Sequence, residues 1–188
     1  MKVRAIALSR RRVAADLAAM TLFAALTAVG ARLSFHLSFT PVPVTGQVFC
    51  VLLAGAALGP WLGFASLVEY LVAGAAGLPI FAHGGGLAAM LGPTAGYLLG
   101  YPFAAMVVGL VSGRGNNRWR LLAGCGAGVV TIYVFGASWF VLWSGFTGKQ
   151  VALMAALGQS VFPFIAIDAA KAGLAAAVTP RVRRRLAS

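Results

Sequence analysis

The chain has 188 residues, 61% of them hydrophobic, and its 15 Lys and Arg against three Asp and Glu give a formal net charge of +12. Only 10% of the residues are charged, whereas a soluble domain has about 25%, so the composition argues against a water-soluble protein. It predicts one integral membrane domain over residues 1–188. The basic residues gather beside apolar segments, a placement that argues against nucleic-acid binding.

Six apolar segments follow one another along the chain and predict an all-α protein with six transmembrane helices. A helix needs about 20 residues to cross the hydrocarbon core, while the apolar part of a signal peptide has roughly 7–15. The first segment reaches the longer length, so we interpret it as a retained helix. The second and third segments are shorter, and a turn at Gly59-Pro60 separates them. The predicted spans are Val13–Leu33, Gln47–Leu58, Trp61–Ala76, Thr94–Gly113, Leu121–Trp143 and Gln159–Val178.

Three basic clusters orient the six spans, because Lys and Arg concentrate on the cytoplasmic side of a membrane. The clusters at the N-terminus, at Arg114–Arg120 and at the C-terminus share one side when four spans precede the second cluster and six precede the third. We therefore expect cytoplasmic termini at residues 1–12 and 179–188 and a helical bundle at 13–178. In the last outer loop we expect a short surface helix from Lys149 to Leu157. The loops expected outside are Ser34–Gly46, Gly77–Pro93 and Ser144–Gly158.

Ionisable side chains inside the predicted spans are few, and each costs about 3 kcal/mol or more at mid-depth in a bilayer. Asp16 and Arg32 lie near opposite ends of the first span, where both side chains can reach an interface. Glu69 lies halfway along the third span. We interpret it as a protonated or paired carboxyl group that holds helices together, with Arg32 as its candidate partner.

Asp168 and Lys171 are three residues apart in the sixth span, so their side chains share one helix face. In a helix that starts at Gln159, Asp168 lies about 13 Å below the start, near the bilayer midplane. Two interpretations stay open: an internal salt bridge that neutralises both groups, and the polar floor of a cavity that opens outward. A carboxylate accepts and an ammonium donates hydrogen bonds, so the second interpretation suits a small ligand with donors and acceptors.

The loop Gly77–Pro93 is apolar and contains three consecutive glycines at Gly84–Gly86. Without the Lys and Ser or Thr of a P-loop, these glycines do not indicate a phosphate site. The loop is either a lid over an outward cavity or an ordinary connector. Aromatic side chains would form the walls of such a cavity, unless they are anchors at the membrane interface. They are Phe81, Tyr97, Tyr133 and Trp139.

The sequence predicts no metal site. His36 and His83 are 47 positions apart, and we interpret them as too isolated to form a metal-binding pair. His83 would instead form a hydrogen bond within its own loop. Cys50 and Cys125 lie in apolar segments without the spacing of metal ligands or of a disulfide framework, and they are expected to be small buried hydrophobic residues.

Short motifs along nearly the whole chain resemble the BioY family of biotin transporters in their order and spacing. The chain departs from the family pattern at Gly46, at His83 within the glycine-rich loop and at Glu69. The motifs that carry the resemblance are Val42-Pro-Val-Thr-Gly-Gln47, Leu53-Ala-Gly-Ala-Ala-Leu-Gly-Pro60, Gly77-Leu-Pro-Ile-Phe-Ala82, Gly92-Pro-Thr-Ala-Gly-Tyr97, Pro163-Phe164 and Asp168-Ala-Ala-Lys171.

The resemblance implies a six-helix substrate-binding component of an energy-coupling factor (ECF) importer in the bacterial cell membrane. Such a protein binds biotin from the outside and works with a transmembrane coupling subunit and a pair of ATPases. The chain itself would need no cofactor, since it has no Walker motif and ATP would be used by its partners. The first helix would dock on the coupling subunit through small residues, unless these pack within the bundle. They are Ala14, Ala18, Ala24 and Ala28.

For the ligand, the resemblance implies that Asp168 accepts hydrogen bonds from the ureido N–H groups of biotin and that Lys171 donates to the ureido oxygen. The reverse pose, with Lys171 on the biotin carboxylate, stays open. A small membrane enzyme and a scaffold without ligand also stay open as functions, although no catalytic set of residues is evident. The candidate ligand contacts are Asp168, Lys171, Tyr133, Phe81, Tyr97, His83, Gln47 and Thr94.

Overall fold

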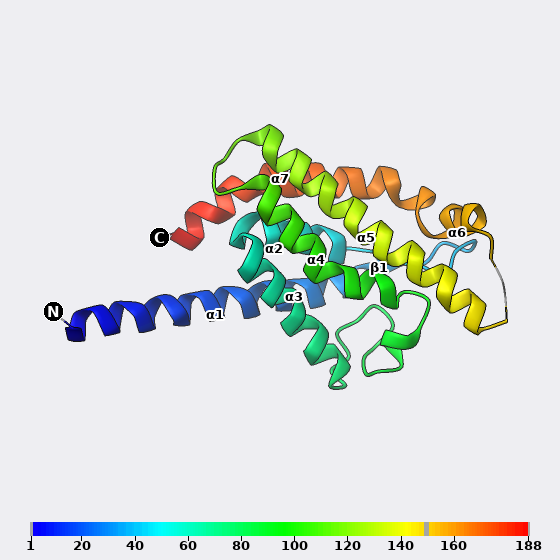
Figure 1. The fold of residues 1–188 in the computed structure, drawn as a ribbon, viewed down its shortest axis with the longest axis horizontal. Helices are drawn as coiled ribbons and strands as arrows, with labels where there is room; N and C mark the ends of the chain where they lie inside the picture. The colour runs from blue at the N-terminus through cyan, green and yellow to red at the C-terminus, as the bar shows by residue number, and fades with distance from the viewer. Residues whose placement is uncertain (1, 149–150, 188) are drawn as a thin grey trace.

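The protein is a bundle of helices in this computed structural model, which describes residues 2–148 and 151–187. Both ends of the described chain lie at one end of the bundle, while the segment 77–93, the two short strands and α6 lie toward the other (Figure 1). In chain order the elements are α1 Lys2–Arg32, β1 Ser34–Phe35, β2 Val44–Thr45, α2 Gln47–Leu58, α3 Pro60–Ala75, the 3₁₀ turn η1 Ala89–Leu91, α4 Ala95–Ser112, α5 Arg118–Phe146, α6 Leu153–Ser160, the 3₁₀ turn η2 Phe162–Phe164 and α7 Ile165–Ala187.

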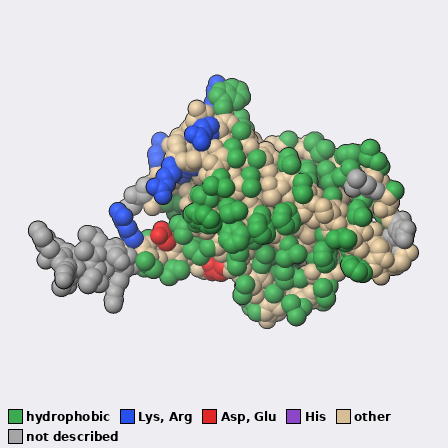
Figure 2. Space-filling model, viewed as in Figure 1, with side chains coloured by type: hydrophobic (Ala, Val, Ile, Leu, Met, Phe, Trp, Pro, Cys, Tyr) green, Lys and Arg blue, Asp and Glu red, His purple; other side chains and the backbone are tan. Residues whose placement is uncertain are grey.

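Apolar surface covers the outside of the bundle. Hydrophobic side chains occupy most of the face in Figure 2, and Lys and Arg gather near the end that carries the termini. Within the described residues, four helical segments are long and apolar enough to cross a membrane. They are Arg12–Arg32, Ala95–Ser112, Arg118–Phe146 and Met154–Leu186, the last of which runs across α6, η2 and α7.

The first five predicted spans each correspond to one helix. The second span matches α2 residue for residue, and the third and fourth differ from α3 and α4 by one residue at each end. The fifth helix begins three residues earlier than predicted because the Asn117 side chain caps it, accepting hydrogen bonds from the backbone N–H groups of Trp119 at 2.9 Å and Arg120 at 3.2 Å. The first helix extends back to Lys2, so the basic N-terminal stretch is helical.

The predicted start of the sixth span at Gln159 is wrong. Helix α6 ends at Ser160 and the chain passes through η2, where Pro163 lacks the N–H that a continuous helix would need. Helix α7 begins only at Ile165, which places Asp168 in its first turn and removes the depth estimate based on Gln159. The surface helix predicted from Lys149 also begins later, at Leu153, and Lys149 lies outside the described residues.

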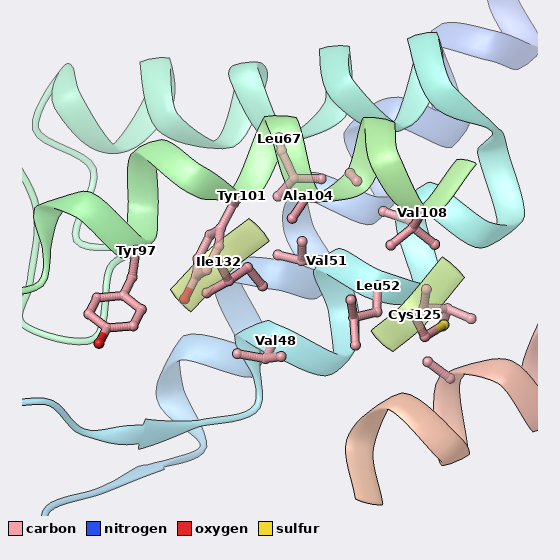
Figure 3. Close-up of a cluster of buried hydrophobic side chains, with 14 of the residues drawn as sticks. Val48, Val51, Leu52, Leu67, Tyr97, Tyr101, Ala104, Val108, Cys125 and Ile132 are labelled. Carbon is pink, nitrogen blue, oxygen red and sulfur yellow. The ribbon is translucent and has the colours of Figure 1, made fainter. Parts of the chain in front are cut away.

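Glycine allows the central helices to approach closely. A Cβ on Gly55 in α2 would lie 2.2 Å from the carbonyl oxygen of Ala105 in α4, and one on Gly109 would lie 2.4 Å from the nitrogen of Pro60. Such contacts are typical of helices that associate in lipid through small residues. Buried side chains from α2, α3, α4 and α5 then fill the centre of the bundle (Figure 3), among them Cys125, as predicted.

At the end of the bundle that carries the termini, Arg183 connects α7 to other segments through hydrogen bonds. From α7 its guanidinium group donates to the carbonyl oxygens of Ala56 in α2 at 2.6 Å, Gly113 after α4 at 2.6 Å and Gly115 at 2.6 Å. The last carbonyls of a helix have no partner inside the helix, and a cation there also complements the helix dipole. One side chain therefore joins three segments that are distant in sequence.

The predicted pairing of Glu69 with Arg32 is wrong. Glu69 accepts a hydrogen bond from the Thr21 hydroxyl at 2.8 Å, whereas Arg32 donates to the carbonyl oxygen of Pro79. Thr21 and Arg32 are eleven residues apart on α1, which corresponds to about 16 Å along a helix. The side chain of Glu69, halfway along α3, therefore meets the middle of α1 and not its end.

Candidate ligand-binding site

A cavity lies between the loop that contains β1 and β2, the segment 77–93 and the helices α4, α5 and α7. The two short strands and the segment 77–93 lie toward the end of the bundle away from the termini (Figure 1). Its lining is mainly apolar, with a few polar groups, as is usual for small-molecule sites. The lining residues are Val42, Pro43, Val44, Thr45, Val48, Phe81, Ala82, His83, Ala89, Thr94, Tyr97, Leu98, Tyr101, Ile132, Tyr133, Phe164, Asp168 and Lys171.

Asp168 and Lys171 form the salt bridge that was one of their two interpretations, and both side chains also line the cavity. The Lys171 ammonium donates to Oδ1 of Asp168 at 2.7 Å, and the Tyr133 hydroxyl donates to Oδ2 at 2.8 Å. The Asp168 side chain is 5% exposed and that of Lys171 is 17% exposed. A carboxylate has about four acceptor positions, so two remain for a ligand after these bonds form.

The start of α7 provides a second feature of the Asp168 site. The residue lies in the first turn of the helix, where unpaired N–H groups and the helix dipole stabilise a negative charge. Lys171 follows one turn later on the same face, and Tyr133 reaches across from α5. Two side chains, one from α5 and one from α7, therefore hold the Asp168 carboxylate in a fixed position beside the cavity.

Aromatic side chains form part of the wall. Phe81, which is 1% exposed, packs edge-on against Tyr70 of α3, with ring centroids 5.3 Å apart. Tyr97 lines the cavity while its hydroxyl donates to the carbonyl oxygen of Ser160. Trp139 is not among the lining residues, which corrects its prediction as a wall; its indole N–H donates to the carbonyl oxygen of Gly92 at 2.8 Å instead.

The segment 77–93 is held against α1, α3 and α5 at several points. Phe81 and Gly84 exchange backbone hydrogen bonds of 2.8 and 3.1 Å, and the N–H of Gly86 donates to the carbonyl oxygen of Gly74 at 2.7 Å. Gly84 and Gly86 both have positive φ angles, at 105° and 85°, which explains glycine at these positions. Arg32 of α1 and Trp139 of α5 add bonds to Pro79 and Gly92.

Seven of the eight predicted ligand contacts line the cavity, and Gln47 does not. Gln47 is buried behind the wall, where its amide donates to the Tyr70 hydroxyl at 2.6 Å. Tyr70 in turn donates to the carbonyl oxygen of Ile80 at 3.0 Å, next to Phe81. Gln47 therefore supports the segment 77–93 and does not face the cavity directly.

His36 and His83 lie next to each other, so the expectation that they are isolated is wrong. Their ring centroids are 5.3 Å apart, because the loop after α1 folds against the segment 77–93. Partial burial and the neighbouring His36 lower the pKa of His83 from its ordinary value of 6.5. The two histidines do not form a metal centre with other ligands, since no group of three or more His, Cys, Asp and Glu is suited to a metal ion within the described residues.

Sequence reasoning missed several lining residues, which are the apolar residues around β2 together with Thr45, Ala82, Ala89, Leu98, Tyr101, Ile132 and Phe164. A signal was present for Tyr101, which is four residues after Tyr97 and therefore on the same face of α4. Thr45 lies within the motif that carried the family resemblance. No comparable signal marked Ile132, since α5 is apolar on all sides.

The four alanines of α1 separate into two pairs. Ala14 and Ala18 are exposed, while Ala24 is 8% exposed and belongs to the core. Ala28 packs against the same core. Packing within the bundle therefore accounts for the second pair, and the first pair remains available on the surface.

Comparison with known proteins gives consistent results. The family model described as BioY family matches residues 2–188. The probable biotin transporter BioY of Pyrococcus horikoshii is 42% identical over 171 residues, which cover 90% of this chain and 97% of that protein. The biotin transporter BioY of Thermotoga maritima is 37% identical over 165 residues, covering 87% and 92%. A crystal structure of the S-component for biotin from an ECF-type ABC transporter superposes with a TM-score of 0.79 at 25% identity, covering 93% of each chain.

Proposed function

This chain belongs to the BioY family, and we propose that it captures biotin outside the cell and delivers it inward as the substrate-binding component of an ECF-type importer. The relatives are named as transporters, so a transport role takes precedence over that of a membrane enzyme or a scaffold. The protein is a multi-pass protein of the plasma membrane. The observation that carries the binding role is the mainly apolar cavity with one fixed carboxylate, Asp168, on its wall.

In the proposed complex, the ureido ring of biotin binds beside Asp168 and Lys171. The ureido N–H groups donate to the acceptor positions of Asp168 that Tyr133 and Lys171 leave open, and the ammonium of Lys171 donates to the ureido oxygen. Phe81 and Tyr97 pack against the bicyclic ring and the valeryl chain. Two features support this pose: the ion pair borders the cavity, and the rest of the lining is mainly apolar.

The proposed topology has six spans, formed by α1 to α5 and α7, with both termini in the cytoplasm. The positions of both chain ends at one end of the bundle agree with an even number of crossings (Figure 1). Helix α2 has 12 residues and is about 18 Å long, less than the roughly 30 Å of a hydrocarbon core, so the bilayer is thinned beside it or α2 is shielded by its neighbours. The segment 77–93 is the proposed lid.

The proposed partners are an ECF transmembrane coupling subunit and two ATPase subunits, and ATP is used only by them. The exposed pair Ala14 and Ala18 on α1 offers a flat surface for a helix of the coupling subunit. Ala24 and Ala28 contribute to partner binding indirectly, because they pack α1 against the rest of the bundle. The chain itself requires no cofactor in this scheme.

Calorimetric titration of the purified protein in lipid nanodiscs with biotin tests the proposal. We expect saturable binding by the wild-type protein and at least roughly tenfold weaker binding by Asp168→Asn and by Lys171→Ala, because hydrogen bonds to charged groups contribute about 1.5–3 kcal/mol. Asp16→Asn is the matched control, since Asp16 is exposed on α1. Failure of the wild-type protein to bind biotin would contradict the function. Wild-type affinity in both variants would leave the function intact and reject the pose.

A further inference from the structure

Two histidines meet where two loops close over the cavity. His36 follows β1, His83 belongs to the segment 77–93, and their ring centroids are 5.3 Å apart at an interplanar angle of 50°. His83 lines the cavity, so a ligand inside can reach its ring. These are the two histidines of the whole sequence.

The surroundings of the two rings favour an anion. The sequence contains three acidic residues, and each is placed elsewhere: Asp16 on α1, Glu69 bonded to Thr21, and Asp168 paired with Lys171. A fixed positive charge on the loop side is Arg32, which donates to Pro79 in the same segment as His83. A negatively charged group of the ligand beside the histidines would therefore not be repelled by a carboxylate from either loop. The guanidinium group of Arg32, which contacts the same segment, would attract it.

The ion pair of Asp168 and Lys171 on the cavity wall is poorly suited to bind a ligand carboxylate. The ammonium of Lys171 is already bonded to Asp168 at 2.7 Å, so a second carboxylate there would lie close to a like charge. The rest of the lining is mainly apolar, with Val44, Leu98 and Ile132 among its residues. A ligand with a neutral polar ring, an apolar chain and a terminal carboxylate matches these surfaces when its ring binds at the ion pair and its carboxylate binds beside His83.

We infer that His36 and His83 form a proton-linked binding site for the carboxylate of the ligand at the lid end of the cavity. The inference rests on the proposed function and names the chemical class that the site selects: free acids bind, and neutral derivatives of the same acid bind less well. When the carboxylate enters, one imidazole takes up a proton from solvent and donates one N–H to it, and its other N–H donates to the second, neutral imidazole.

Proton linkage follows from the electrostatics of the pair. Burial and His36 already lower the pKa of His83 in the free protein, so the His83 ring is mainly neutral before the ligand binds at neutral pH. A carboxylate beside the ring raises the pKa in the complex. The gain in affinity is therefore complete below the free-state pKa and is lost as the pH rises through the higher pKa of the complex. The charged and titratable groups around the pair are Arg32, Tyr97, Tyr101, Tyr133, Asp168 and Lys171.

Calorimetric titration with two ligands tests the site. Biotin carries the carboxylate, and biotinamide has the same ring and chain with a neutral end. From pH 6 to pH 8 we expect the affinity for biotin to fall about tenfold, the effect of a one-unit change in pKa, while the affinity for biotinamide stays constant. Titrations in phosphate and in Tris, which differ in ionisation enthalpy, should show proton uptake with biotin and none with biotinamide.

His83→Gln should remove the pH dependence and lower the affinity for biotin at pH 6 to near that for biotinamide, and His36→Gln should have a smaller effect in the same direction. Leu87→Gln is the control for a polar substitution in the same segment, because Leu87 is 68% exposed. Equal, pH-independent binding of both ligands would overturn the histidine site alone, as would an unchanged pH dependence in His83→Gln. Absence of binding by both ligands would overturn the proposed function and the site together.

Discussion

The two polar ends of the cavity are built in different ways. At one end, helices hold Asp168: Tyr133 of α5 and Lys171 of α7 bond to both of its oxygens, and the side chain is 5% exposed. At the other end, loops bring His36 and His83 together, and both rings are exposed. The helical end is a fixed ion pair whose two charges neutralise each other, whereas the loop end carries the charge of Arg32 and, in the proposed site, gains a proton when a carboxylate binds.

Because of this difference, substitutions at the two ends of the cavity should differ in their effects on protein stability and on the rate of ligand release. A buried ion pair that loses one partner leaves an uncompensated charge, so substitutions at the helical end should lower the stability of the folded state as well as the affinity for biotin. Loops open locally at small cost, so substitutions at the loop end should act mainly on the rate at which ligand leaves. Three substitutions probe this separation.

The largest effect is expected for Tyr133→Phe at the helical end. It removes a hydrogen bond to a charged group, worth about 2 kcal/mol, and should lower the Tm of the purified protein by roughly 4–8 °C. Tyr97→Phe is the comparison, because the hydroxyl group of Tyr97 donates to a neutral acceptor, the carbonyl oxygen of Ser160, and its loss should cost about half as much. An unchanged Tm in Tyr133→Phe would show that the helical end is not a stability determinant.

A smaller effect, and one of a different kind, is expected for Gly74→Ala at the loop end. The new Cβ would lie 2.1 Å from the Phe81 ring, so the ring must move and the segment 77–93 must shift with it. Overpacking of about 1–2 kcal/mol should speed the release of radiolabelled biotin roughly tenfold and lower the Tm by less than Tyr133→Phe does. Gly126→Ala is the control, since nothing lies within 4 Å of its added Cβ.

The smallest effect is expected for Trp139→Phe, which removes the bond that fastens Gly92 to α5. Loss of one neutral hydrogen bond of about 1 kcal/mol should raise the rate of biotin release about fivefold. Trp143→Phe is the control, because Trp143 stacks on Phe140 and phenylalanine retains that contact. Equal release rates in the two variants would show that the bond to Gly92 does not hold the segment 77–93 closed.

The sequence predicted best what depends on local chemistry. The limits of α2 follow from a glycine before it and Gly59-Pro60 after it, and the pairing of Asp168 with Lys171 follows from helical spacing. Pro163 was visible as a potential helix breaker, yet the apolar pattern continued past it and placed the start of the last helix too early.

What depends on tertiary folding was not predictable in the same way. The contact of His36 with His83 spans 47 positions and requires two loops to fold onto each other. The same holds for Trp139, whose apolar surroundings suggested a cavity wall although its N–H group finds a carbonyl on the segment 77–93. Apolar patterns show which residues avoid water, but they do not show which of several apolar neighbours a side chain will contact.

Arg183 has a mechanical consequence. Its guanidinium group joins α7 to the ends of α2 and α4, and the fully buried side chains of Val51, Leu52 and Val108 fill the bundle between that end and the cavity (Figure 3). The opening of the cavity for the proposed ligand is therefore expected on the loop side. We therefore expect that the chain by itself forms no continuous pore and that solute does not leak through it. In the proposed function, each biotin molecule must leave the cavity through the same opening by which it entered.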